Sequence, residues 1–173
     1  MRRIGALIIL VICTSSLIAQ NSKTVFFVRH GEKVSEAKDA VLSDIGKQRA
    51  MCLAGVLADA GVETILASDV QRTQQTAQPL ADRLHEKLTI IPAADTAKWV
   101  SEIKSAPGNT LVVGHSDTLP MIIQQLTGKA VKIGSGDYDD LFVVTFDPNP
   151  SAPLLLHYCK QPAPGPPQNM MVR

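Results

Sequence analysis

The sequence predicts an α/β domain in three layers, with a mostly parallel central sheet and helices on both of its faces. Two observations predict this fold. From residue 24 to residue 158, apolar runs of strand length alternate with segments whose apolar residues recur at helical spacing. The runs at residues 24–28 and 109–114 also lack the alternation of a half-exposed strand, which indicates strands buried on both faces. Parallel strands joined by helices satisfy both observations.

The first strand is the run TVFFV at residues 24–28, and a loop at residues 34–41 follows it. Ser43 is well placed to cap the next helix, because a serine hydroxyl accepts a hydrogen bond from the free amides of a first helical turn. Gly61 is expected to end this helix, since glycine readily adopts the left-handed conformation that closes many helices. The apolar residues at helical spacing are Leu53, Ala54, Leu57 and Ala58.

A second strand is predicted at residues 63–68, where the sequence is ETILAS. Ser68 or Asp69 is expected to cap the following helix, which runs to about His85. The segment LTIIP at residues 88–92 then predicts a short third strand.

The second half of the domain begins with a short helix predicted at residues 97–105 and a strand at residues 109–114. A helix follows in which Pro120 is tolerated because it lies in the first turn. Its apolar residues at helical spacing are Leu119, Ile122, Ile123 and Leu126. Two last strands, at residues 140–146 and 153–158, are joined by a turn rich in proline, which favours an antiparallel pair near an edge of the sheet.

The first 20 residues differ from the rest of the chain. Two arginines precede an apolar run at residues 4–13, and small and polar residues follow it. This order predicts a secretory signal peptide over residues 1–20, cleaved near Ala19 or Gln20, and hence a periplasmic or secreted protein. Because the apolar run is shorter than the roughly 20 residues that span a bilayer, no stable membrane insertion is expected after cleavage.

The remainder is interpreted as one domain at residues 21–160 and a tail at residues 161–173. A chain of 173 residues with 45% hydrophobic residues can bury one sizeable core and does not require a second domain. The tail is rich in proline and is expected to be disordered. The domain keeps Cys52 and Cys159, and the sequence leaves open whether they form a disulfide or two buried thiols.

Charge and motif content exclude several classes of function. A formal net charge of +1 with scattered charges provides no basic face for nucleic acid. The chain has neither a phosphate-binding glycine loop ending in Lys-Ser or Lys-Thr nor a dinucleotide fingerprint, so no cofactor is expected. No metal is expected either, because the cysteines are not in pairs and the four histidines are far apart in sequence. The oligomeric state is left open.

Polar residues follow three of the predicted strands. Arg29 and His30 come directly after the first strand, Arg72 lies in the first turn of the helix after the second, and His115 follows the strand at residues 109–114. Ligands of an open parallel sheet bind in the crevice at the carboxyl ends of its strands. We therefore expect these side chains to form one pocket that attracts anions, in which the forked guanidinium groups suit phosphate oxygens.

Four segments carry a resemblance to a known family. They are VRHGEK at residues 28–33, LSDIGKQRA at 42–50, SDVQRTQQTA at 68–77 and VVGHSDTLP at 112–120. In order and spacing they resemble the histidine phosphatase superfamily, whose members include the phosphoglycerate mutases, and the compact chain looks like a short exported bacterial member. The resemblance implies the phosphoglycerate mutase-like form of the predicted fold.

The resemblance also implies roles for the residues at the strand ends. His30 would be the nucleophile that becomes a phosphohistidine, and Arg29, Arg72 and His115 would hold the phosphate oxygens. Physical chemistry supports these roles, because nearby arginine charges keep a histidine neutral and stabilise charge on a transferring phosphoryl group. Arginines in these places make a metal unnecessary.

The proton donor for the departing oxygen has more than one candidate in the sequence. Asp117 is predicted to be this catalytic acid, although it is also a natural cap for the following helix. Asp95 and Glu102 lie roughly where the mutase-like members carry a glutamate, and a chain without a dedicated acid is a further alternative.

Two charged neighbours of His30 are given two interpretations. Glu32 and Lys33 could form a surface ion pair with each other, which would contribute little, or lie at the pocket mouth and contact substrate. Away from the predicted pocket, His85 and His157 are expected to be ordinary surface residues.

The predicted function is hydrolysis of a phosphate monoester, on a small phosphorylated substrate, through a phosphohistidine intermediate on His30. The alternatives are a phosphohistidine phosphatase that acts on protein, a phosphoryl transferase of the phosphoglycerate mutase type, and a phospholigand-binding module without turnover.

Overall fold

The computed structural model describes residues 22–160. The predicted signal peptide at residues 1–20 and the predicted tail at residues 161–173 lie outside the described residues. The strands are β1 (Lys23–Arg29), β2 (Val62–Ser68), β3 (Leu88–Ile91), β4 (Asn109–Gly114), β5 (Asp140–Asp147), β6 (Asn149–Pro150) and β7 (Leu154–His157). The helices are α1 (Asp44–Val56), α2 (Gln71–Leu84), α3 (Thr96–Ser105) and α4 (Thr118–Thr127).

The strands form one sheet in the order β3-β2-β4-β1-β5-β6, with β7 also paired to β5. Strands β1 to β4 are parallel to one another, whereas β5 is antiparallel to β1 and β7 is antiparallel to β5. This confirms the predicted sheet and its antiparallel edge. The apolar runs of β1 and β4 are neighbours at the centre, and their register pairs Arg29 with Gly114. The residues that follow these two strands are therefore brought side by side.

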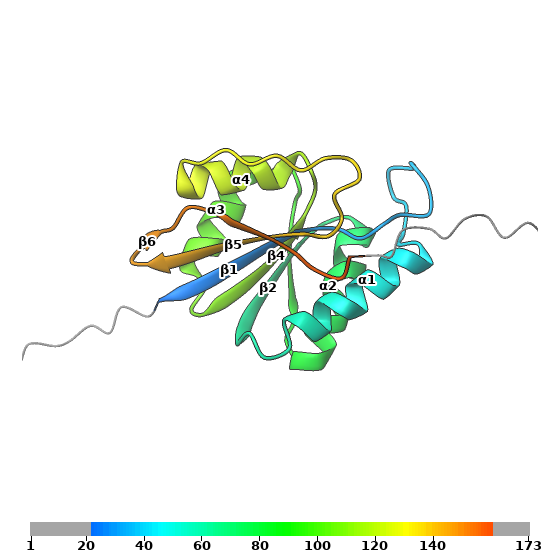
Figure 1. The fold of residues 1–173 in the computed structure, drawn as a ribbon, viewed down its shortest axis with the longest axis horizontal. Helices are drawn as coiled ribbons and strands as arrows, with labels where there is room; N and C mark the ends of the chain where they lie inside the picture. The colour runs from blue at the N-terminus through cyan, green and yellow to red at the C-terminus, as the bar shows by residue number, and fades with distance from the viewer. Residues whose placement is uncertain (1–21, 161–173) are drawn as a thin grey trace, which may run out of the picture.

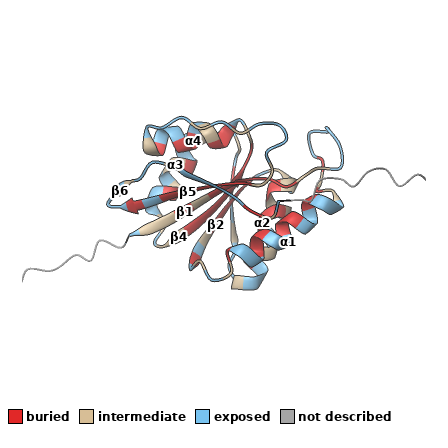
Figure 2. Ribbon diagram, in the orientation of Figure 1, coloured by how far each residue is buried: buried red, intermediate tan, exposed pale blue. Residues whose placement is uncertain are grey.

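Helices cover both faces of the sheet, which gives the predicted three layers. Helices α3 and α4 lie on one side and α1 and α2 on the other (Figure 1). On the first side Trp99 and Ile122 pack on sheet residues such as Val112, and on the second Leu53 and Leu80 pack in a separate core. Figure 2 shows the buried residues concentrated in the central strands and on the helix faces turned toward them. Apolar burial on both faces holds the strand ends in place.

The helix boundaries agree with the prediction at some ends and differ at others. Ser43 caps α1 as predicted, because its hydroxyl accepts a hydrogen bond from the Gly46 amide at 3.2 Å. The helix ends at Val56, however, and not at Gly61. Turns fill the interval, and Gly61 instead adopts a positive φ of 62° just before β2. The prediction placed the glycine correctly at a left-handed position but assigned the turns before it to the helix.

A disulfide joins Cys52 of α1 to Cys159, which follows β7. Their Cα atoms lie 6.2 Å apart although 107 residues separate them in the sequence. The question that the sequence left open is thus answered by one bridge, which fastens the last described segment to the helix layer.

None of the helices within residues 22–160 has both the length and the apolar character needed to cross a membrane.

Candidate active site

A cavity of about 450 Å³ opens at the carboxyl ends of β1 and β4, beside the first turns of α2 and α4. The predicted site residues that line it are Arg29, His30, Lys33, Arg72, His115 and Asp117. Three other candidates, Glu32, Asp95 and Glu102, do not line it. The fold therefore brings together these side chains from three separate segments of the chain, as expected for residues at the carboxyl ends of parallel strands.

His30 is held with one ring nitrogen available to a ligand. Its backbone amide donates to the Gly114 carbonyl at 3.0 Å, and only 4% of the residue is exposed. The ring nitrogen Nδ1 lies 2.8 Å from the carbonyl oxygen of Gly31. A carbonyl oxygen can only accept, so Nδ1 must carry the proton. In the neutral ring the lone pair is then on Nε2.

The glycine after His30 lets helix α1 approach the strand end. A Cβ on Gly31 would lie 2.9 Å from the carbonyl oxygen of Gly46, and a Cβ on Gly46 would collide with the carbonyl of Glu32. The Gly31 amide also donates to the hydroxyl of Thr76 on α2 at 2.9 Å. Backbone contact at this distance requires glycine at both positions. The turn that carries His30 is therefore clamped between two helices.

Two arginines on either side of His30 keep a donor unused. Arg29 Nη1 donates to the carbonyls of Gly134 and Ser135, and its guanidinium lies 4.3 Å from the centre of the Tyr138 ring. Arg72 Nη1 donates to the carbonyl of Lys38. The Nε of each arginine is buried and has no hydrogen-bond partner among the described residues. Buried donors are rarely left unpaired, so these two indicate a place for an acceptor such as an anion.

The two histidines of the cavity form an edge-to-face pair, with ring centroids 5.2 Å apart. Burial lowers the pKa of His30 to about 3, and the charges of His115, Arg29 and Arg72 act in the same direction, against the hydrogen bond to Gly31. Burial, followed by the charge of Arg72, lowers the pKa of His115 to about 4. Both rings are therefore neutral near pH 7, which is the form that carries a lone pair.

Ser68 belongs to the site, and its predicted role as a helix cap is wrong. Its hydroxyl is fully buried and contacts His115 Nε2 at 2.9 Å and Thr73 Oγ1 at 2.8 Å. The alternative cap, Asp69, is also wrong, because its carboxylate accepts from the amide of Ala93 and helix α2 has no side-chain cap. The sequence offered a serine at a strand end as a signal, but its partner His115 is 47 residues away.

Asp117 is the one carboxylate that lines the cavity within residues 22–160. Its Oδ1 accepts from the Thr118 amide at 2.8 Å, which confirms its role as the cap of α4. Asp95 is exposed and caps α3 through the Lys98 amide, and Glu102 lies further along the same helix. The structure thus leaves Asp117 as the acidic candidate that lines the same cavity as the two histidines.

The predicted ion pair between Glu32 and Lys33 is wrong. Lys33 pairs with Glu36 at 2.6 Å and lines the cavity. Glu32 instead binds Arg49 at 2.6 Å and lies outside the lining, contrary to the interpretation that placed it at the pocket mouth. Sequence reasoning missed Arg49 because its partner lies 17 residues earlier, on a different element.

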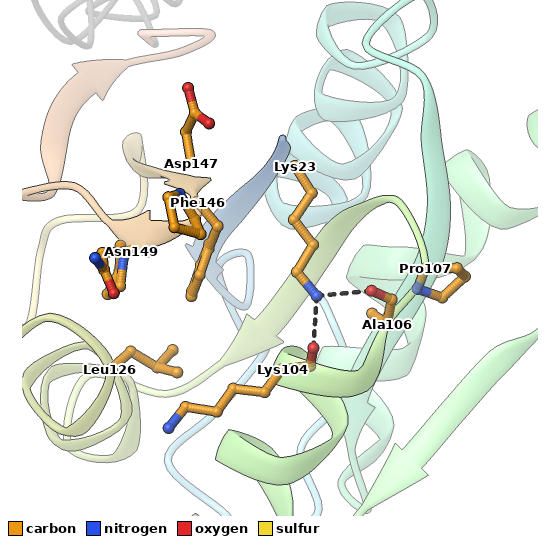
Figure 3. A pocket seen from close by; sticks show the side chains of 10 residues that line it. Lys23, Lys104, Ala106, Pro107, Leu126, Phe146, Asp147 and Asn149 are labelled. Carbon is orange, nitrogen blue, oxygen red and sulfur yellow. Dashed lines mark hydrogen bonds between the residues drawn. The ribbon is translucent and has the colours of Figure 1, made fainter. Parts of the chain in front are cut away.

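A second cavity, of about 520 Å³, lies at the opposite end of the central strands, where β1 begins and β5 ends. Figure 3 shows Lys23 reaching across it to the carbonyls of Lys104 and Ala106. The ammonium group also binds the Ile103 carbonyl, so it satisfies the last carbonyls of α3. None of the histidines between residues 22 and 160 lines this cavity. Lys23 therefore has a structural role here, and the predicted site residues lie in the other cavity, at the carboxyl ends of β1 and β4.

Comparison with known sequences agrees with this arrangement. The model of the histidine phosphatase superfamily (branch 1) matches residues 25–95. A probable phosphoglycerate mutase, GpmB, of Yersinia enterocolitica is 37% identical over 75 residues, which are 39% of this chain and 35% of the relative. The corresponding protein of Yersinia pestis is 37% identical over 65 residues, 34% of this chain and 30% of the relative. The match thus spans about a third of the length of these curated relatives.

Solved structures share the fold over most of the chain. A putative alpha-ribazole-5'-P phosphatase from Escherichia coli has a TM-score of 0.66 at 16% identity, covering 79% of this chain and 97% of the other. The protein histidine phosphatase SixA, complexed with tungstate, has a TM-score of 0.65 at 20% identity, covering 78% and 96%. Residues 25–95 are thus similar in sequence to branch 1 of the histidine phosphatase superfamily, and the chain has the fold of these solved structures.

Proposed function

We propose that this protein is a phosphatase that hydrolyses a phosphate monoester through a covalent phosphohistidine on His30. One observation carries the proposal: a buried, neutral His30 with an unprotonated Nε2 lines the same cavity as Arg29 and Arg72, each of which has an Nε donor without a partner among the described residues. A nucleophile and unpaired anion-binding donors in one place are what phosphoryl transfer requires.

The proposed reaction has two steps. In the first, the lone pair on His30 Nε2 forms a bond to phosphorus as the bond from phosphorus to the ester oxygen breaks, and Asp117 gives that oxygen a proton. In the second, Asp117 removes a proton from a water molecule whose oxygen attacks phosphorus. The phosphorus–nitrogen bond breaks, and phosphate and His30 are released. Each residue ends in the state in which it began.

Charge in the cavity favours the transfer. Arg29 and Arg72 supply positive charge and N–H donors for the equatorial oxygens of the phosphoryl group. The donors are fixed before substrate arrives, because each guanidinium is already anchored by its Nη1 to loop carbonyls. Preorganised donors of this kind stabilise the transition state without a cost of reorganisation.

The substrate is proposed to be a small phosphorylated molecule. The cavity volume of about 450 Å³ suits a small ligand, and Lys33 and Lys38 on the loop after β1 also line it. The disulfide between Cys52 and Cys159 supports a site of action outside the cytoplasm, because disulfides persist in oxidising compartments. We therefore propose a periplasmic or secreted enzyme.

The test is a comparison of the protein with His30→Ala on an aryl phosphate such as p-nitrophenyl phosphate. The variant is expected to lose turnover, and quenching of the parent in alkaline detergent after mixing with a ³²P-labelled ester should leave protein-bound label that is stable to base and released by acid. His85→Ala, a change at an exposed histidine outside the cavity, is the matched control. Equal rates for the parent and His30→Ala would refute the mechanism.

A mutase activity is the second candidate, because the matching Yersinia relatives are named probable phosphoglycerate mutases. A mutase returns the phosphoryl group from His30 to another hydroxyl of the substrate instead of to water. Incubation with a phosphorylated sugar acid distinguishes the two: a phosphatase releases inorganic phosphate, whereas a mutase yields positional isomers.

A further inference from the structure

A chain of buried hydroxyls leads away from the cavity behind His115. Ser68, the last residue of β2, and Thr73, in the first turn of α2, are both fully buried. The Ser68 hydroxyl lies 2.9 Å from His115 Nε2 and 2.8 Å from Thr73 Oγ1. Thr73 Oγ1 in turn lies 2.7 Å from the Val70 carbonyl oxygen and 3.1 Å from that of Ser68. The chain ends at carbonyl groups, which can only accept.

The number of protons available fixes which atom donates in each hydrogen bond of this hydroxyl chain. The shortest contact, from Thr73 Oγ1 to the Val70 carbonyl, needs the one proton of the Thr73 hydroxyl. Thr73 Oγ1 must then accept the proton of Ser68, which leaves the Ser68 oxygen to accept from His115. Every contact is satisfied only when His115 carries a proton on Nε2. The opposite direction would leave two oxygens 2.7 Å apart without a proton between them, in a buried place where this is costly.

We propose that Ser68 and Thr73 are positioning residues that hold His115 in the tautomer with its proton on Nε2, so that Nδ1 is the ring atom left for a ligand. Only the consequence for catalysis rests on the function proposed above. The His115 ring lines the cavity and its Nε2 is turned to Ser68. When an anionic phosphoryl group binds, a proton taken up on Nδ1 gives the ring a donor toward it while the contact to Ser68 stays unchanged.

The surroundings of His115 support a ring with its proton on Nε2 and with Nδ1 left for a ligand. The charged groups that face the ring are Arg29 on β1, Arg72 on α2, Asp69 after β2 and Asp117 at the start of α4, and the ring of His30 lies next to it. The arginines disfavour a cationic ring until an anion offsets them. The backbone is fixed independently, because the His115 amide donates to Thr118 Oγ1 and its carbonyl accepts from Leu119. The hydroxyl chain therefore sets the protonation pattern, and the backbone sets the position.

The direct test is nuclear magnetic resonance of the ¹⁵N-histidine-labelled protein. Long-range proton–nitrogen spectra distinguish an Nε2–H ring from an Nδ1–H ring, and the signal lost in His115→Gln identifies the residue. We expect the Nε2–H form in the parent and a mixture of tautomers in Ser68→Ala and in Thr73→Val, which keeps the shape of threonine without the hydroxyl. Thr73→Ser should restore the parent spectrum.

A matched control removes another fully buried threonine hydroxyl. Thr110 lies near the start of β4, and its hydroxyl binds the Gly108 carbonyl away from the cavity. Thr110→Val should leave the His115 signal unchanged, and circular dichroism checks that each variant is folded. An Nδ1–H tautomer in the parent, or an unchanged His115 signal in Ser68→Ala, would overturn the proposal.

Kinetics provide the second measurement. Loss of the hydrogen-bond partner of a metal-bound imidazole costs about 10- to 100-fold in activity, and we expect a fall of about this size in kcat/KM on an aryl phosphate for Ser68→Ala. It should recover in Thr73→Ser relative to Thr73→Val and stay within about twofold of the parent in Thr110→Val. Suppose that the parent shows the Nε2–H form and Ser68→Ala a mixture of tautomers, but that neither protein nor the other variants turn over the ester. This result would support the hydroxyl chain and refute the proposed phosphatase.

Discussion

Arg49 of α1 forms an ion pair with the carboxylate of Glu32, which lies two residues after His30. Its Nε lies 3.0 Å and 2.9 Å from the two carboxylate oxygens, and its Nη2 donates to Oε1 at 2.6 Å. Burial raises the pKa of Glu32, but the hydrogen bonds and the charge of Arg49 outweigh burial and hold that pKa below its usual value. Arg49 Nη1 also donates to the Cys159 carbonyl. One guanidinium thus connects the turn that carries His30 with the segment after β7.

Arg49→Met is expected to lower the free energy of unfolding by about 2–4 kcal/mol. The methionine keeps much of the packing but leaves the Glu32 carboxylate largely buried without its partner, which is costly. Urea denaturation measures the loss. Lys47→Met is the matched control on the same helix, since the pair of Lys47 with Asp44 is exposed and should contribute less than about 1 kcal/mol. Equal losses in the two variants would show that the Glu32–Arg49 pair behaves as a surface ion pair.

The disulfide between Cys52 and Cys159 should stabilise the fold more than a disulfide that closes a short loop. It closes a loop between residues 107 positions apart, and closing a loop of about 100 residues is worth about 4–5 kcal/mol in the unfolded chain. Reduction of the folded protein is therefore expected to lower the free energy of unfolding by about 2–5 kcal/mol in urea. The double variant Cys52→Ala/Cys159→Ala should start from that lower value and show no response to the reductant. A parent that is insensitive to reductant would contradict the expectation.

The central sheet was predictable because its signals are local. An apolar run such as TVFFV reports burial of a strand on both faces, and the strands on either side of the β1–β4 pair could be recognised in the same way. The end of α1 could not be predicted in this way, because residues 57–61 have the composition of a helix but form turns that lead into β2. Tertiary context, and not propensity, chose between these structures.

The residues of the candidate site likewise fall into those with a local signal in the sequence and those without one. Arg29, His30 and His115 could be placed because a strand end fixes where the next residue lies. Ser68 and Arg49 could not, since each acts through a partner on another element, and a serine before a helix has the simpler interpretation of a cap. Their roles follow from distances that exist only in the folded chain.

Stability should fall as the pH is lowered from about 6.5 toward 3, in part because of the two cavity histidines. Burial, as the largest cause, lowers the pKa of His30 to about 3 and that of His115 to about 4. In this pH range the unfolded chain binds protons that the folded chain does not, so protons favour unfolding, and the contribution is complete only above about pH 6.5. Each ring contributes a slope of up to about 1.4 kcal/mol per pH unit.

His30→Gln should therefore show a shallower loss of stability with acid than the parent, whatever its stability at pH 7. The measurement is the free energy of unfolding in urea at several values between pH 4 and pH 7. His115→Gln should flatten the same part of the curve, and the double variant should flatten it further. If the curves of the parent and His30→Gln run parallel, His30 is not a buried neutral ring.

Asp117 lines the cavity and also caps α4 through its Oδ1, and its capping role can be separated from a catalytic one. Oδ1 accepts from the Thr118 amide, so Asp117→Asn keeps an acceptor for the helix cap while removing the carboxyl group. We expect the free energy of unfolding to change by less than about 1 kcal/mol. If Asp117 is the proton donor, kcat on an alkyl phosphate should fall by about 10²- to 10⁴-fold. An aryl phosphate, whose leaving group needs little protonation, should be affected far less.

Asp95→Asn is the matched control, because Asp95 caps α3 through the Lys98 amide and does not line the cavity. It should leave the ratio of alkyl to aryl turnover at the parent value. An equal fall on both substrates in Asp117→Asn would point to disturbed phosphate binding, and unchanged turnover on both would leave Asp117 with its capping role alone. Only a loss confined to the alkyl ester, where the departing oxygen requires a proton, identifies the catalytic acid.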